Sequence, residues 1–165
     1  MPLFPIFVDL SNATALVVGE VAEAERKAAL LRPFCAEVLR CPYPPVYDTP
    51  PGVVVLAQTD HPENAFWAAH FRALGAMVNT ADRPELCDFQ FPALIVRDDV
   101  SVGVSTGGGS PALAGMLRQR LEDALPEDLE TVCQQAAELT ARLRQEIPDR
   151  QLRARALRKA LEELL

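Results

Sequence analysis

The sequence predicts an α/β fold in which a parallel β-sheet is followed by a β-hairpin and a helical C-terminal region. Between residues 14 and 81, apolar runs of strand type alternate with stretches of helical period. Strands that alternate with helices form parallel sheets covered on both faces. Beyond residue 92 this alternation stops, and two short strand-like runs follow each other directly, as in a hairpin.

The elements of the predicted sheet follow in order. Residues 14–19 (TALVVG) read as a buried strand, and residues 20–32 place apolar side chains at helical spacing before Pro33 ends the helix. Further strands are expected over residues 36–41, 53–59 and 76–81, with a helix over residues 60–75. Five prolines stand in the twelve residues 41–52. They predict a stiff, extended loop there.

The C-terminal half is predicted to hold a hairpin and helices. The hairpin spans residues 93–106 and turns at Asp98 and Asp99. The next helix opens on Ser110 as N-cap and Pro111 at its first position. From Pro126 the chain is helical, with a break at Pro148. The predicted regions are residues 1–82, a dinucleotide-binding-type region; residues 83–125, hairpin, loop and helix; and residues 126–165, C-terminal helices.

Composition excludes several classes of function. A formal charge of −7 argues against nucleic-acid binding, which needs a basic surface. No apolar run approaches the length of a membrane span, and the first residues lack a basic signal-peptide region, so we expect a cytoplasmic protein. No metal site is expected, because no C-x-x-C pair occurs and histidines are scarce. The cysteines, which we interpret mainly as buried thiols, are Cys35, Cys41, Cys87 and Cys133.

The turn after the first strand is a candidate anion site, because helix N-terminal N–H groups attract phosphate. A dinucleotide site and a plain strand-to-helix turn remain equal alternatives, since only one glycine is present. Arg40, at the end of the second strand, would tolerate a 2′-phosphate, which leaves NAD and NADP both open. The candidate cofactor-binding residues are Gly19, Glu20, Val21, Ala22, Glu23, Tyr43, Pro44, Thr59, Asp60 and Asn79.

Two later stretches are candidates for substrate chemistry. Asp82 follows a parallel strand at its carboxyl end, where open α/β sheets bind ligands, so it is a candidate general base; a turn or capping role is the alternative. The loop STGGGSP gathers N–H donors suited to carboxylates or phosphates, or else is a tight turn that requires glycine. Its candidate substrate-binding residues are Ser105, Thr106, Gly107, Gly108, Gly109 and Ser110.

These pieces resemble, across essentially the whole chain, the amino-terminal module of siroheme synthase, the precorrin-2 dehydrogenase family. The matching stretches are LFPIFVDL, LVVG with ERKA after it, QTD, VNTADRPELCDFQFP and VSTGGGSPALAGMLRQRLE. The resemblance implies a Rossmann-like fold, and oxidation of precorrin-2 to sirohydrochlorin with NAD. In some members, ferrous iron is a further substrate and is inserted to give siroheme. Asp82 would be the base, and the loop from Ser105 to Ser110 would bind the tetrapyrrole.

The resemblance also implies a homodimer in which the hairpin and the C-terminal helices are exchanged. The sequence departs from the family pattern in its cofactor half. Gly19-Glu20-Val21 stands where the family has three glycines, RPFCAE lacks the glycine that usually closes the first helix, and the loop from Pro42 to Gly52 replaces a helix-sized connection. An alternative is therefore a tetrapyrrole-binding or chelatase-only homologue without NAD-dependent activity.

Overall fold

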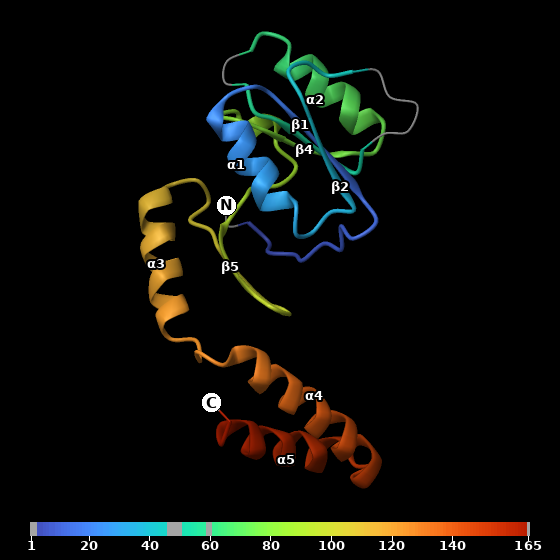
Figure 1. Ribbon diagram of the computed structural model, residues 1–165, viewed down its shortest axis with the longest axis vertical. Helices are drawn as coiled ribbons and strands as arrows, with labels where there is room; N and C mark the ends of the chain where they lie inside the picture. The colour runs from blue at the N-terminus through green and yellow to red at the C-terminus, as the bar shows by residue number, and fades with distance from the viewer. Residues whose placement is uncertain (1–2, 46–50, 59–60, 165) are drawn as a thin grey trace. The chain divides into compact units, whose positions relative to one another are not determined.

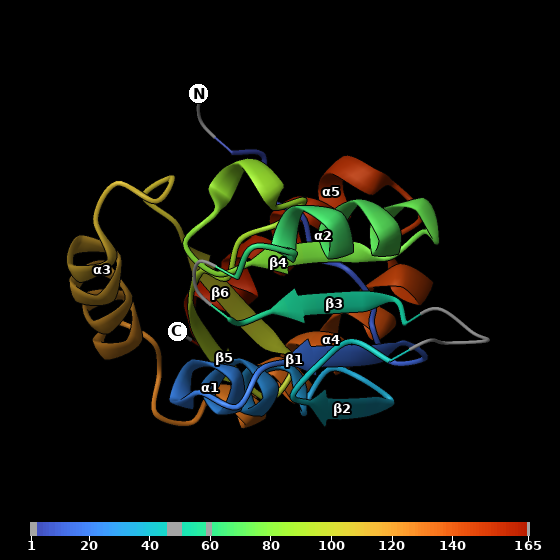
Figure 2. The same cartoon turned by 90° about the horizontal axis from the view of Figure 1, so that it is seen from above.

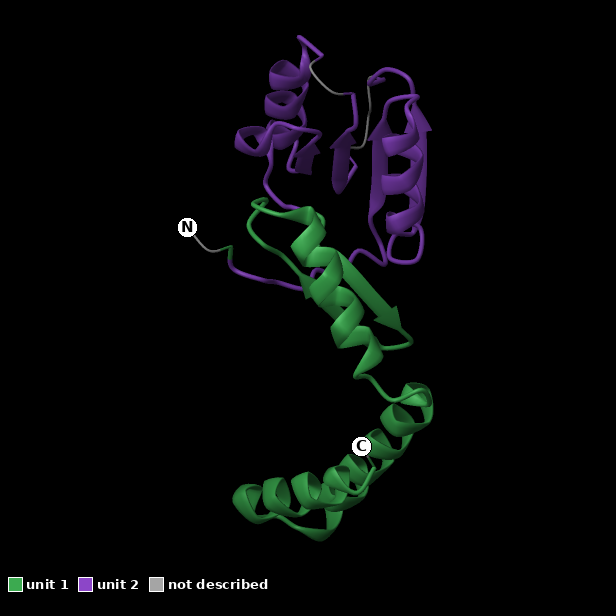
Figure 3. Cartoon of the chain, turned by 90° about the vertical axis from the view of Figure 1, so that its left-hand side faces the viewer, with its two compact units in different colours: residues 1–3, 91–165 green, residues 4–90 purple. Residues whose placement is uncertain are grey.

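The computed structural model describes residues 3–45, 51–58 and 61–164, in which the chain forms two compact units (Figure 3). One unit comprises residues 4–90, and the other consists mainly of residues 91–165. The chain passes from one to the other between Gln90 and Phe91. The division predicted from sequence, with limits at residues 82 and 125, remains a prediction.

The first unit is built on a four-stranded parallel sheet in the order β2-β1-β3-β4. Val18 pairs in register with Cys41 and Leu56, and Leu56 pairs with Thr80. The carboxyl ends of all four strands therefore lie at one edge of the sheet. The strands are β1 (Thr14–Val18), β2 (Glu37–Cys41), β3 (Val53–Leu56) and β4 (Met77–Thr80).

Helices α1 (Ala22–Leu31) and α2 (Asn64–Ala73) lie on opposite sides of this sheet (Figure 1). Side chains alternate between the two faces of a strand, and Leu16 and Val18 belong to the same apolar cluster as Phe71 of α2. The intervening Val17 is fully buried on the other face, which α1 covers. This arrangement follows from right-handed crossovers on either side of β1.

The second unit begins with an antiparallel hairpin of β5 (Ala93–Arg97) and β6 (Val100–Val104). Three helices follow: α3 (Pro111–Asp123), α4 (Leu129–Glu146) and α5 (Arg150–Glu162) (Figure 2). Ser110 caps α3 as expected, because its Oγ accepts the N–H of Leu113 at 3.2 Å. The break between α4 and α5 falls at Pro148.

The predicted α/β class, parallel sheet, hairpin and C-terminal helices are confirmed. Several elements are shorter than expected: the strand expected over residues 53–59 ends at Leu56, and the first helix spans Ala22–Leu31. The second helix of the sheet begins at Asn64, not at residue 60, because the Asn64 N–H bonds the His61 carbonyl oxygen and its side-chain Nδ2 bonds the Gln58 carbonyl oxygen. These contacts form a turn before the helix starts. In the described part of the chain, no helix is long and apolar enough to cross a membrane.

Candidate functional site

Gly19 forms the turn between β1 and α1. Its φ of +135° is a conformation that other residues rarely adopt, and its N–H bonds the Cys41 carbonyl oxygen at 2.8 Å. A Cβ here would lie 3.4 Å from Cγ of Gln58, in tight but tolerable contact. Val21, the N-cap of α1, has no polar side chain to cap the helix. The first N–H groups of α1 are therefore suited to an anion.

The acidic residues in the first turn of α1 are paired with cations. Glu23 lies 2.7 Å from Arg26 and 3.6 Å from Lys27, and the hydrogen bond from Arg26 holds the Glu23 pKa below its usual value. Glu25 pairs with Arg32 and Arg40. The negative charge that these two carboxylates bring to the first turn of α1 is thus largely compensated, whereas Glu20, in the turn before the helix, is exposed.

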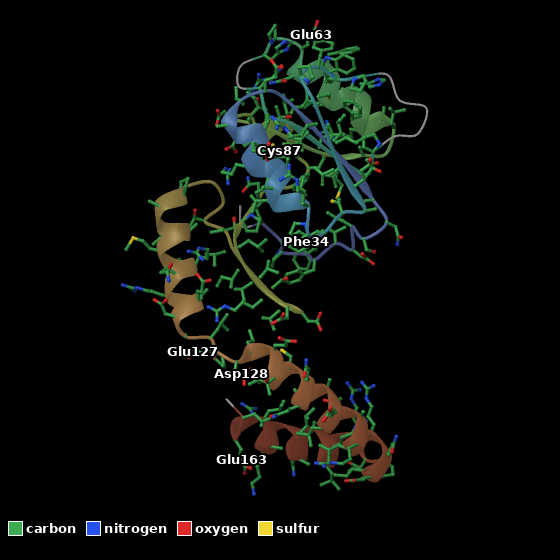
Figure 4. The ribbon with its side chains drawn as sticks, viewed as in Figure 1. Phe34, Glu63, Cys87, Glu127, Asp128 and Glu163 are labelled. Carbon is green, nitrogen blue, oxygen red and sulfur yellow. The ribbon has the colours of Figure 1, made fainter. Side chains whose placement is uncertain are left out.

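A clasp of three residues, Tyr43, Glu63 and Trp67, ties the loop after β2 to the start of α2, where Figure 4 labels Glu63. The Tyr43 hydroxyl and Trp67 Nε1 both donate to the Glu63 carboxylate, and this lowers the Glu63 pKa. The rings of Tyr43 and Trp67 pack edge to face, with their centroids 5.7 Å apart. Nearby, Gln58 Nε2 donates to the Pro42 carbonyl oxygen at 2.7 Å.

The clasp borders a small crevice at the carboxyl ends of β1 and β3. Tyr43 and Pro44 are among its lining residues, together with Gln58 and Trp67. Two other candidate cofactor-binding residues, Thr59 and Asp60, lie outside the described residues. Glu63 and Trp67 were not anticipated from the sequence. Their spacing of four residues on a helix was the available signal, because it puts both side chains on one face.

Asp82 lies in a turn directly after β4. Its side chain is exposed, and its backbone is left-handed, with a φ of +55°. The thiol of Cys87 lies 3.2 Å from the Thr80 nitrogen and 3.3 Å from the carbonyl oxygens of both Thr80 and Arg83. The turn that carries the candidate base therefore encloses the Cys87 thiol, to which the sequence analysis gave no role beyond that of a buried thiol.

Asn79 is largely buried, with 6% of its surface exposed. Its Oδ1 accepts from Nζ of Lys27 at 2.9 Å, and its Nδ2 donates to the Phe89 carbonyl oxygen at 2.9 Å. Lys27 is only 6% exposed, and burial lowers its pKa against the opposing effect of Glu23. The sequence signal for Lys27 was its place on the buried face of α1, three residues after Ala24 and four before Leu31. In this structure the Asn79 amide therefore connects Lys27 of α1 to the Phe89 backbone.

The glycine-rich loop belongs to the second unit and is organised by Thr106. The Thr106 hydroxyl donates to the Ser110 carbonyl oxygen at 3.0 Å and accepts the Ser110 N–H at 3.1 Å. Gly107 and Gly108 have φ values of +63° and +83°, and a Cβ on either would meet nothing within 4 Å. Glycine is needed there for backbone conformation, not for space.

Two arginines toward the C-terminal end of α3 differ in their pairing. Arg118 on α3 pairs with Glu122, whereas Arg120 is exposed. The thiols of Cys35, Cys41, Cys87 and Cys133 are free of disulfides. Among the residues that the structure describes, no group of three or more histidine, cysteine or acidic side chains could hold a metal ion.

Two family models match the chain. The one described as "Putative NAD(P)-binding" matches residues 48–93, and the one described as "Sirohaem biosynthesis protein central" matches residues 97–124. The first includes the Asp82 turn but not Gly19. The second includes the whole glycine-rich loop.

Siroheme synthases are similar to nearly the whole chain. That of Methylococcus capsulatus is 36% identical, over 98% of this chain and 39% of its own length. That of Pseudomonas aeruginosa is 33% identical, over 93% of this chain and 38% of its own length. The chain thus spans about two fifths of these relatives. The Methylococcus comparison extends over 184 residues, although this chain has 165, so the relative contains segments that are missing here.

A solved structure titled "SirC, precorrin-2 dehydrogenase" is similar in fold, with a TM-score of 0.67 and 21% sequence identity. The likeness covers 98% of this chain and 100% of that one. The same α/β unit with its hairpin and helices therefore occurs in both proteins. The sequence relatives and the two family-model matches place this chain among the relatives of the siroheme synthases, and the solved structure shares its fold.

Proposed function

We propose that the chain is a precorrin-2 dehydrogenase of sirohaem biosynthesis, which oxidises precorrin-2 to sirohydrochlorin with NAD. One observation carries the proposal: the Gly19 turn and the Asp82 turn both follow strands that end at the same edge of one parallel sheet. Ligands of open α/β sheets bind at this edge. A dinucleotide held at the first turn and a base in the second would then be neighbours.

The residues at the Gly19 turn fit a dinucleotide. The uncapped first N–H groups of α1 would hold the pyrophosphate, and Gly19 allows the backbone to come close. Arg40 lies at the end of β2, with Nη2 3.5 Å from the Gly19 carbonyl oxygen, on the ribose side of such a site. When bound, NAD accepts the hydride that the substrate loses.

The protein's own residues supply the proton chemistry and the substrate site. Oxidation removes a proton as well as a hydride, and the exposed carboxylate of Asp82 is the group proposed to accept that proton. The carboxylates of the tetrapyrrole would bind to the N–H groups of the loop from Ser105 to Ser110, which leads into the N-terminus of α3. If the family's second reaction occurs, Asp82 would also take protons from pyrrole nitrogens as ferrous iron enters.

The alternative is a tetrapyrrole-binding or chelatase-only homologue. The observation that favours it is the short Gly19-Glu20-Val21 turn, which lies beside a crevice already bordered by the clasp and the Gln58 to Pro42 hydrogen bond. In this case the glycine-rich loop would bind the tetrapyrrole and Asp82 would act on it without NAD.

One assay separates these functions. The purified chain is mixed with precorrin-2 and NAD, and NADH formation is followed by absorbance, with NAD omitted as the control. We expect NADH and sirohydrochlorin to appear in equal amounts. Binding of sirohydrochlorin without NADH formation would instead support the binding protein. Siroheme formation from sirohydrochlorin and ferrous iron, again without NADH, would support the chelatase.

We further propose that the chain acts as a homodimer in the cytoplasm, where its free thiols would stay reduced. Helix α3 exposes an apolar stripe of four side chains that are 38 to 61% accessible, and such stripes are usually covered by a partner. The stripe consists of Leu113, Met116, Leu117 and Leu121. The family resemblance implies a second copy of the chain as partner, with the hairpin, the helices from residue 126 onward and their apolar stripe from Leu129 to Leu143 at the interface; we propose that the α3 stripe belongs to the same interface.

Met116→Glu is expected to convert the dimer to a monomer, because it places a carboxylate in the middle of the stripe. Sedimentation velocity at several protein concentrations measures the change. Gln119→Glu is the matched control, since it adds the same charge on an exposed face of α3 outside the stripe. A wild-type chain that sediments as a monomer, or a Met116→Glu chain that remains dimeric, would contradict this interface.

A further inference from the structure

The turn that carries Asp82 is held in an unfavourable backbone conformation. A φ of +55° is uncommon for any residue but glycine, although aspartate tolerates it better than most. The hydrogen bond that closes the turn, from the Arg83 N–H to the Thr80 carbonyl oxygen, is long at 3.5 Å. Such a conformation persists only when surrounding contacts enforce it.

Cys87 supplies these contacts from inside the turn. Its Sγ accepts the Thr80 N–H at 3.2 Å, and the same sulfur lies 3.3 Å from the carbonyl oxygens of Thr80 and Arg83. The thiol hydrogen can bond one of these two oxygens at a time. One side chain can therefore form hydrogen bonds to the backbone both before and after Asp82, and an apolar side chain of similar size could form none.

Buried side chains also fix the position of Cys87. Asn79 Nδ2 lies 3.6 Å from Sγ while bonding the Phe89 carbonyl oxygen, and Lys27 fixes the amide through Oδ1. Cys87 also lies close enough to Lys27 of α1 for the two side chains to interact electrostatically. The segment after Cys87 is also tied to β4, since the Val78 N–H bonds Asp88 Oδ2 at 2.9 Å and the Asp88 N–H bonds the Val78 carbonyl oxygen at 2.8 Å.

We propose that Cys87 is the positioning residue for Asp82: its thiol, backed by Lys27 and Asn79, keeps the turn in the conformation that presents the carboxylate at the sheet edge. The inference rests on the proposed role of Asp82 as general base. Cys87 itself does not react. Its thiol acts through hydrogen bonds to the Thr80 and Arg83 backbone.

The test compares Cys87→Ala and Cys87→Ser with Cys35→Ala, which removes another half-buried thiol of the same unit. In Cys87→Ala we expect kcat for precorrin-2 oxidation to fall about 100-fold, the size of effect produced by a small misplacement of a catalytic group, with KM unchanged. Cys87→Ser keeps a donor and an acceptor and is expected to recover much of the loss. Cys35→Ala is expected to retain the wild-type kcat.

Amide hydrogen exchange gives a readout that does not depend on activity. Loss of the sulfur acceptor is expected to speed exchange of the Thr80 N–H about tenfold in Cys87→Ala, and Cys87→Ser is expected to restore protection. Unchanged kcat and unchanged Thr80 exchange in Cys87→Ala would overturn the inference. A different outcome is also informative. If Thr80 exchange is faster in Cys87→Ala but the Asp82→Asn variant is fully active, Cys87 holds the turn as described and Asp82 is not the base.

Discussion

Asp82→Asn is expected to lower kcat for NAD-dependent oxidation of precorrin-2 by about 1000-fold, within the range for loss of a general base. The amide has the size of the carboxylate but cannot accept the proton. Asparagine also tolerates the left-handed conformation of this position, so the turn should be retained. Steady-state measurement of NADH formation gives kcat, and KM should stay near its wild-type value because the substrate loop is untouched.

Asp98→Asn is the matched control for this variant. Asp98 is also exposed, and its φ of +51° puts it in the same backbone region, but it lies in the turn of the hairpin. It should retain wild-type kcat. If Asp82→Asn retained it as well, another group would have to accept the proton, and the proposed mechanism would be wrong even with NADH formation intact.

Thr106→Val is expected to weaken tetrapyrrole binding on the order of tenfold, because the substitution keeps the shape of the side chain and removes both hydrogen bonds to Ser110. Each of these bonds is worth about 1 kcal/mol. Without them the loop can leave the conformation that presents its N–H groups. Titration with sirohydrochlorin, followed by its absorbance spectrum, measures the dissociation constant without requiring turnover.

The control for the loop is Thr131→Val, the same substitution at an exposed position of α4. It should leave tetrapyrrole affinity unchanged. Thr106→Val should raise KM for precorrin-2 more than it lowers kcat, which is the reverse of the pattern expected for Asp82→Asn. Wild-type affinity in Thr106→Val would mean that the loop does not bind the tetrapyrrole through a conformation held by this hydroxyl.

Local sequence signals were sufficient for most of the fold. Helices bury residues 15–18 of β1 on both faces, and these four residues are all apolar, which is a strong local signal for a buried strand. Ser110 and Pro111 marked the start of α3 because a cap and a first-turn proline act within one helical turn. The start of α2 was misplaced because contacts of Asn64 with His61 and Gln58 override the local pattern.

The candidate site was only partly predictable. Asp82 and the Thr106 loop could be named because each lies in a continuous motif. Lys27 could not, because it bonds a residue 52 positions away. Cys87 could not either: its partners Thr80 and Arg83 are only seven and four positions away, but the irregular chain between β4 and Cys87 has no period that would place them together. Asn79 was expected to face a cofactor, yet its neighbours in space engage its amide in the interior.

The sequence by itself determined the order and type of the elements, the cap of α3, and the two motifs that carry the proposed chemistry. These depend on residues within a few positions of one another, through hydrophobic period, capping and turn preference. Only the tertiary structure decided that Arg40 of β2 pairs with Glu25 of α1, that Asn79 is buried, and that the Cys87 thiol contacts the backbone on both sides of Asp82. Those outcomes depend on which side chains the folded chain brings together, and such contacts leave no regular pattern in consecutive residues.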